Sequence, residues 1–264
     1  MRYCILFALV PLILFSCNSS KQNNQQIAKK TSDKIYQYSL FTALANSVYD
    51  GELTVAEVKE KGDLGIGTYN AMDGEMIVVD GNVYQLFADG SVLQPDDEVL
   101  VPFTVVTFFD EDKNFGIDVA ENYADLQSKL RNKLQLNNLG VAFRITGDFE
   151  YIKCGGANKQ PRPFTKTLSE ALEDRPIYEK ENISGTMVGF WYPQYVGKVN
   201  VVGFHLHFLS EEKDLGGHVM ELKVSNLKVS VDICDGFEIE LPVNEDFTTT
   251  NFDLSQEYNN KKKD

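Results

Sequence analysis

The stretch VVGFHLHFLSEEKDLGGHV, residues 201–219, holds all three histidines of this 264-residue chain. His205 and His207 stand two positions apart in an apolar run. Because strand side chains alternate between the two faces of a sheet, both imidazoles would point to the same side. A polar turn, SEEKD, and two glycines follow, and His218 then opens another apolar run. The pattern predicts a β-hairpin that returns His218 to the side of the first pair.

Three imidazoles gathered in this way suit a metal ion. Neutral imidazoles with an open fourth position are the usual ligands of catalytic zinc, although nickel, cobalt and iron accept similar ligands. The alternative is a hairpin with three structural histidines. We favour a metal site, with zinc as the first choice, because the rest of the chain has no histidine. Such a site serves hydration, hydrolysis or enediolate chemistry equally well, so the pattern names no reaction.

The sequence around this window predicts an α+β fold. Residues 184–242 read as strands almost throughout and form a β-rich C-terminal part that bears the metal hairpin. The N-terminal part should be a mixed β-sheet with flanking helices. Its expected helices are residues 41–51, 53–62, 121–136 and a short one within 165–175, opened by a Thr167-x-x-Glu170 capping box. Its expected strands lie within residues 74–94, 102–109 and 139–154, with Asp-Gly hairpin turns at 80–81 and 89–90.

The composition limits the class of partner. The chain is 43% hydrophobic, which is enough for a sizeable core, and its formal net charge is −14 with a pI of about 4.7. A surface of this charge repels phosphate backbones, so nucleic acid is excluded as a partner. Beyond the first 17 residues only Cys154 and Cys234 remain, and they could form one disulfide.

The first residues are typical of an exported protein. In MRYCILFALVPLILFSCNSS, residues 1–20, the apolar run is too short to span a membrane and fits a secretory signal. It ends in LFSC, which resembles a bacterial lipobox and implies lipidation of Cys17. We therefore expect a membrane-anchored lipoprotein of the bacterial cell envelope, attached through its lipid only. An ordinary signal peptide or a cytosolic protein with an apolar start are the alternatives.

This interpretation divides the chain into four parts. They are a signal peptide with its lipobox (1–17), a flexible tether (18–34), a two-part body (35–250) and a polar tail (251–264). The tether and the tail have too few large apolar side chains to offset the entropy cost of ordering.

Several spaced motifs resemble the acetolactate decarboxylase family. Residues 185–222 contain G-x-x-V-G-F, then G-[YF]-H-x-H-F, then G-G-H. Residues 65–85, GIGTYNAMDGEMIVVDGNVYQ, resemble the G-x-G-T-[FY]-N-x-x-D-G-E segment of that family. Residues 38–51 and 102–109 resemble further blocks. The motifs occur in the family's order, and the likeness runs from about residue 36 to residue 245.

The resemblance implies an activity and a site. The family converts 2-acetolactate, a small hydroxy-keto acid, to acetoin and carbon dioxide. Its members have two α/β-type domains and usually form a homodimer. Its zinc ligands would be His205, His207 and His218. Glu75 would position the substrate and take part in proton delivery, and Thr68 would hydrogen-bond within the site. Taken alone, Glu75 also reads as an ordinary turn carboxylate, because D-G-E is common in hairpins.

Two positions depart from the family pattern. The place of the family's catalytic arginine falls on Gly155, and its C-terminal glutamate has no clear counterpart, with Glu257 and Asp264 as substitutes. Basic side chains near Gly155 are out of register: Lys153, Lys159 and Arg162. Two alternatives to acetolactate decarboxylation therefore stay open. One is a family member that acts on another hydroxy-keto acid, and the other is a non-catalytic surface module that binds a metal or ligand.

Overall fold

The computed structural model describes residues 33–252, which belong to one compact unit. The expected signal peptide with Cys17 lies outside the described residues, as do nearly all of the expected tether and tail, including Glu257 and Asp264. Among the helices of residues 33–252, none is both long enough and apolar enough to cross a membrane.

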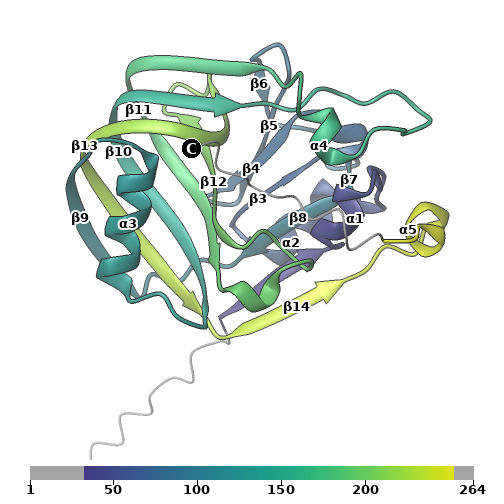
Figure 1. Cartoon of the computed structure of the whole chain (residues 1–264), viewed down its shortest axis with the longest axis horizontal. Coiled ribbons are helices and arrows are strands. Elements are labelled where there is room, and N and C mark those ends of the chain that lie inside the picture. Colours follow the sequence, from purple (N-terminus) through teal and green to yellow (C-terminus); the bar gives the residue numbers. More distant parts are fainter. Residues whose placement is uncertain (1–32, 253–264) are drawn as a thin grey trace, which may run out of the picture. The chain divides into compact units, whose positions relative to one another are not determined.

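A seven-stranded mixed sheet forms one layer, with strand order β14-β1-β8-β3-β4-β5-β6 (Figure 1). Its strands are β1 (Lys34–Tyr38), β3 (Leu64–Thr68), β4 (Glu75–Val79), β5 (Asn82–Leu86), β6 (Val92–Leu93), β8 (Phe103–Thr107) and β14 (Gly236–Glu240). Only β14 and β1 pair in parallel. The turn between β4 and β5 is the predicted Asp-Gly pair, with positive φ at both residues. Two short strands, β2 (Leu53–Thr54) and β7 (Leu100–Val101), pair separately.

The second layer is a ring of long strands. Its strands are β9 (Lys113–Ala120), β10 (Gly140–Gly155), β11 (Ile177–Tyr192), β12 (Gly203–Ser210) and β13 (Gly216–Cys234). Because β10 pairs with both β11 and β13, strands β10 to β13 close on themselves, and β9 extends the ring beside β13. Inside it, Phe143, Phe149, Leu206 and Phe208 are fully buried. This ring contains most of the predicted β-rich part, with the histidine hairpin, but it also takes in β10, which the sequence predicts as part of the N-terminal sheet, whereas β14 joins the seven-stranded sheet.

The helices flank these layers, and the first four in chain order fall within the segments predicted as helices. They are α1 (Phe41–Ala45), α2 (Val55–Lys61), α3 (Tyr123–Leu134), α4 (Leu168–Ala171) and α5 (Glu245–Thr249), with 3-10 turns η1 (Asn70–Met72) and η2 (Gln194–Val196). Helix α3 buries Leu126 and Leu130 in the core of the ring. The predicted capping box of Thr167 and Glu170 opens α4. Helix α1 ends six residues before Gly51, because Ser47 already has a positive φ.

The two layers share a core, and this contact positions the site. Ile66 and Phe103 of the seven-stranded sheet belong to one buried cluster with Val188 and Phe190 of β11. The segments near the two ends of the described residues reinforce the contact, because β14 follows the last strand of the ring and pairs with β1 at the edge of the first sheet (Figure 1). Cys154 and Cys234 are buried free thiols in different clusters, so the possible disulfide is not formed.

Candidate metal centre and active site

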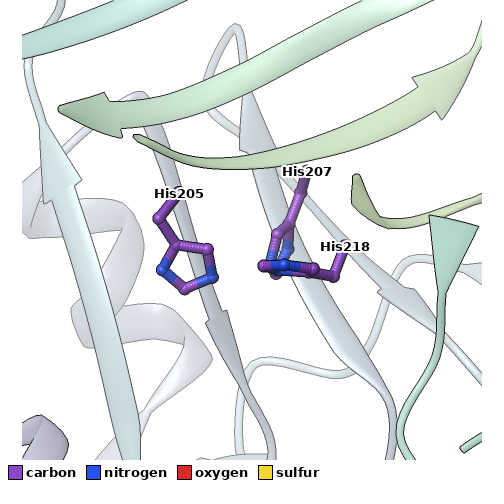
Figure 2. Close-up of side chains that lie close together, drawn as sticks. All are labelled: His205, His207 and His218. Atoms are coloured by element: carbon purple, nitrogen blue, oxygen red, sulfur yellow. The ribbon is translucent and has the colours of Figure 1, made fainter. Parts of the chain in front are cut away.

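The hairpin of β12 and β13 brings the three histidines together, as the sequence predicts. His207 pairs directly with His218 across the two strands, and His205 lies two residues away on the same face of β12. The intervening Leu206 points the other way, into the core of the ring. Figure 2 shows the three side chains gathered between the strands, and their ring centroids lie 5.0–5.6 Å apart.

The donor set fits a metal ion. One nitrogen from each imidazole lies within 4.8 Å of the other two. His207 Nδ1 lies 2.8 Å from the carbonyl oxygen of Met76 on β4, and a carbonyl can only accept, so Nδ1 carries the proton. His207 Nε2 and His205 Nδ1 are buried without a hydrogen-bond partner among the described residues. The lone pair of His207 Nε2 is therefore available to a ligand.

The surroundings keep the imidazoles neutral. Burial, together with the smaller effect of the Arg175 guanidinium, lowers the pKa of His205 to about 4. Burial also holds the pKa values of His207 and His218 well below the usual range, and neighbouring imidazoles add to the effect. A metal binds the neutral form of histidine, so the same burial that disfavours protonation favours a metal site.

Glu75 and Thr68 face the histidines from the seven-stranded sheet. They are cross-strand partners on β4 and β3, so their side chains share one face. Glu75 is buried, and its Oε2 lies 3.7 Å from His207 Nε2. Burial raises the pKa of Glu75 to about 7, against the opposing effect of Arg175. Thr68 Oγ1 donates a 2.7 Å hydrogen bond to the carbonyl of Gly74, in the turn that leads into Glu75.

Arg175 supplies the cation that the sequence interpretation missed. It follows α4, and its Nη2 lies 3.1 Å from Glu75 Oε1, while Nε donates to the carbonyl of Gly156 at 3.0 Å. Its side chain is only 12% exposed. Arg175 belongs to no motif and is separated from Glu75 by 100 positions. The sequence contains only an indirect indication of this residue. A cavity for an organic acid needs a cation, and because Gly155 cannot provide one, another residue has to.

The basic residues considered from the sequence lie elsewhere. Lys153 pairs with Glu179, Lys159 pairs with Asp73 and Arg162 pairs with Asp50, and all three cations are at least one-third exposed. None of the three lines the cavity that holds the histidines. Glu211 and Glu212, in the hairpin turn, are exposed, as expected of solvated carboxylates.

All these groups open onto one cavity of about 120 Å³. Its polar lining consists of the three imidazoles with Thr68, Glu75 and Arg175, and apolar side chains such as Leu44, Phe103 and Phe204 complete it. A small, mainly apolar cavity with a few convergent polar groups suits a small organic molecule. The guanidinium and the metal-binding nitrogens favour one that carries negative charge and several oxygens.

Comparison with known proteins identifies the family. The alpha-acetolactate decarboxylase family model matches residues 35–254. The alpha-acetolactate decarboxylase of Methanosarcina mazei is 40% identical over 84% of this chain and 76% of its own length. That of Brevibacillus brevis is 35% identical over 84% and 77%. The crystal structure of the enzyme from Bacillus subtilis strain 168 has a TM-score of 0.81 at 35% identity, over 83% of this chain and 94% of that one. This chain therefore belongs to the alpha-acetolactate decarboxylase family.

Proposed function

We propose that this protein decarboxylates 2-acetolactate to acetoin and carbon dioxide, on a metal ion held by His205, His207 and His218. Family membership supports the reaction, because the relatives that share most of this chain are alpha-acetolactate decarboxylases. The observation that carries the proposal for the site is the convergence of three neutral imidazoles on one cavity with the buried carboxyl of Glu75.

The reaction needs a sink for electrons and a source of a proton. The bond between the substrate's central carbon and its carboxylate breaks, and carbon dioxide leaves without the bonding electrons. A bound divalent ion supplies a Lewis acid that stabilises the negative charge those electrons create. The apolar part of the lining, including Phe103 and Phe204, limits the access of water to that charge.

Glu75 is the group that would deliver the proton. In the metal-free protein, burial raises the pKa of Glu75 to about 7, so part of the carboxyl is protonated at neutral pH, as a general acid requires. The carboxyl lies beside the histidines and within the cavity, so it can reach a substrate bound there. A proton transferred from Glu75 to the carbon that lost carbon dioxide completes acetoin.

Thr68 would act on Glu75 and on the substrate. Its hydroxyl proton is used in the bond to the Gly74 carbonyl, which holds the turn before Glu75. The hydroxyl oxygen keeps lone pairs that can accept a hydrogen bond from a substrate hydroxyl. Thr68 lines the cavity, as this second role requires.

The departure at Gly155 no longer favours another substrate or a non-catalytic module. Those alternatives depended on a missing cation, and Arg175 places a guanidinium in the cavity.

The test of the proposed reaction is acetoin release from 2-acetolactate by the metal-loaded protein, with Glu75→Gln and His218→Ala as variants. We expect turnover in the wild type, its loss in His218→Ala and a strong decrease in Glu75→Gln. A folded, metal-replete wild type without turnover would contradict the proposal.

Zinc is the ion we propose, because three imidazoles with one open position are typical of catalytic zinc. The test is elemental analysis of protein purified without added metal, with His205→Ala as the comparison. We expect about one zinc per chain in the wild type and far less in the variant. Equal zinc in both proteins would contradict the assignment of these ligands.

We also propose that the protein is anchored to the cell envelope by a lipid on Cys17, as the lipobox-like LFSC motif suggests. Cys17→Ala should then move the protein from the membrane fraction to the soluble fraction. Unchanged partitioning of the variant would refute the anchor.

A homodimer is the assembly we propose, on the strength of the family resemblance. The edge strand β14 adds support, because Phe237 and Ile239 on alternate positions are about 40% exposed. Light scattering coupled to gel filtration should give twice the chain mass, and a monomeric mass would contradict the proposal.

A further inference from the structure

Gly155 and Arg175 compete for one volume beside the histidines. Gly155 ends β10, and Arg175 precedes β11, the strand that pairs with it. A Cβ atom added to Gly155 would lie 2.6 Å from Arg175 Nη2 and would overlap Cζ and Nε as well. Gly155 is outside the positive-φ region, so volume and not backbone conformation excludes a side chain there. The guanidinium of Arg175 fills the space that any side chain at residue 155 would enter.

We propose that Arg175 is a specificity residue whose guanidinium binds the substrate carboxylate, the group that departs as carbon dioxide. The guanidinium reaches the cavity through the space that Gly155 leaves open. This inference rests on the proposed function and adds a residue that the family motif does not mark. A cation at the motif position and the cation of Arg175 are mutually exclusive. The chain carries its guanidinium on a different segment, separated from Gly155 by 20 positions.

The environment of Arg175 suits carboxylate binding. Among the residues that line the cavity, Arg175 is the only arginine or lysine. Its two hydrogen bonds, to Gly156 and Glu75, use Nε and Nη2, and no hydrogen bond between described residues uses Nη1. These bonds hold the plane of the guanidinium, so the remaining N–H groups have a set direction. A guanidinium so oriented can bind a carboxylate through charge-assisted hydrogen bonds.

The first test separates charge recognition from general binding. Metal-loaded wild type, Arg175→Gln and Arg175→Lys are titrated by calorimetry with 2,3-dihydroxy-2-methylbutanoate, a non-reactive acid analogue, and with acetoin, the uncharged product. For Arg175→Gln we expect the Kd of the acid to rise roughly ten- to hundredfold, and that of acetoin to change less than about threefold. Arg175→Lys should fall between, because lysine keeps the charge but loses the planar fork.

Matched measurements exclude a merely structural effect. Arg162→Gln removes an equal charge from a pair with Asp50 outside the cavity lining, and it should bind both ligands as the wild type does. Metal content of Arg175→Gln should match the wild type, and both proteins should be folded at the temperature of the titration. Equal weakening of the acid and of acetoin, or unchanged binding of the acid, would overturn the inference.

A second test concerns the shared volume. The double variant Gly155→Arg/Arg175→Gly moves the guanidinium to the motif position and vacates the space it needs. We expect the double variant to bind the acid at least about tenfold more tightly than Arg175→Gly alone. The reason is that the relocated guanidinium should restore part of the charge-assisted hydrogen bonding to the carboxylate. A double variant no better than the single one would overturn the claim that the two positions share one guanidinium site.

These experiments distinguish the two proposals. A wild type that binds the acid through Arg175 but releases no acetoin from 2-acetolactate would contradict the proposed reaction alone. A wild type that releases acetoin, with an Arg175→Gln variant that still binds the acid normally, would contradict the inference alone. A metal-loaded wild type that binds neither ligand would contradict both.

Discussion

The cavity has two walls that are built in different ways. The histidine wall consists of His205, His207 and His218, which lie within 14 residues on one hairpin. The carboxylate wall consists of Thr68, Glu75 and Arg175, and its ion pair joins positions 100 residues apart. Backbone pairing within the hairpin positions the first wall, whereas the packing of the sheet against the ring positions the second. Damage to the histidine wall should therefore abolish function, and damage to the carboxylate wall should reduce it by degrees.

The largest effect should follow a break in the histidine wall. His207→Ala removes the imidazole whose proton is held by the Met76 carbonyl. We expect metal content to fall close to zero and acetoin release to drop at least about a thousandfold, because a Lewis acid contributes several kcal/mol to the transition state. Elemental analysis and an acetoin assay measure both effects. Glu212→Ala, in the exposed turn of the same hairpin, is the control, and full metal content in His207→Ala would contradict the site.

A smaller, purely chemical effect should follow a change in the carboxylate wall. Glu75→Gln keeps the size of the side chain and removes its proton transfer, so kcat should fall roughly a hundredfold with metal content unchanged. Asp73→Asn alters the neighbouring turn carboxylate, which pairs with Lys159 at the surface, and kcat should stay within about twofold. Equal effects of the two substitutions would mean that Glu75 is itself only a turn carboxylate.

Acid should destabilise the metal-free protein through the histidine wall. The pKa values of the three histidines are lowered on folding, so below pH 6.5 the unfolded chain takes up protons that the folded protein does not. Glu75 acts in the opposite direction between its unfolded pKa of 4.5 and its folded pKa of about 7, because there the folded state holds the extra proton. Three protons against one leave a net loss of stability on acidification.

The size of this acid effect can be measured by denaturant unfolding between pH 7.5 and 5. Once all three histidines titrate in the unfolded chain, the free energy of unfolding should fall by roughly 2–3 kcal/mol per pH unit. The triple variant with glutamine at His205, His207 and His218 should lose this dependence and become slightly more stable as Glu75 protonates. A metal-free wild type whose stability does not change over this range would contradict neutral, buried imidazoles.

The smallest effect should come from the hydroxyl that supports the carboxylate wall. Thr68→Val keeps the shape of the side chain and removes the hydrogen bond to the Gly74 carbonyl. We expect a loss of about 1 kcal/mol, seen as a several-fold decrease in kcat/KM or as lower stability. Thr68→Ser keeps the hydroxyl and should retain most of both. Wild-type behaviour of Thr68→Val in activity and unfolding would show that the bond has no such role.

The elements with strong local signals were predictable. Alternating apolar residues identified β12 and β13, the Asp-Gly pair located the turn between β4 and β5, and helical spacing located α3. Strand β9 was missed, because most of its side chains are exposed and its sequence has no apolar run. The pairing of β14 with β1 could not be predicted either. It joins opposite ends of the described chain, and no residue pattern records which edge a strand will occupy.

In the candidate site, too, some residues were predictable from local sequence patterns and others were not. The sequence by itself determined the histidine wall, because strand alternation and one turn set the positions of all three imidazoles. It also marked Thr68 and Glu75, through a motif on neighbouring strands. Only the tertiary structure decided that Arg175 pairs with Glu75 and occupies the space over Gly155. The physical reason is that local periodicity places residues of one hairpin relative to each other, whereas a contact across 100 positions depends on how two layers pack.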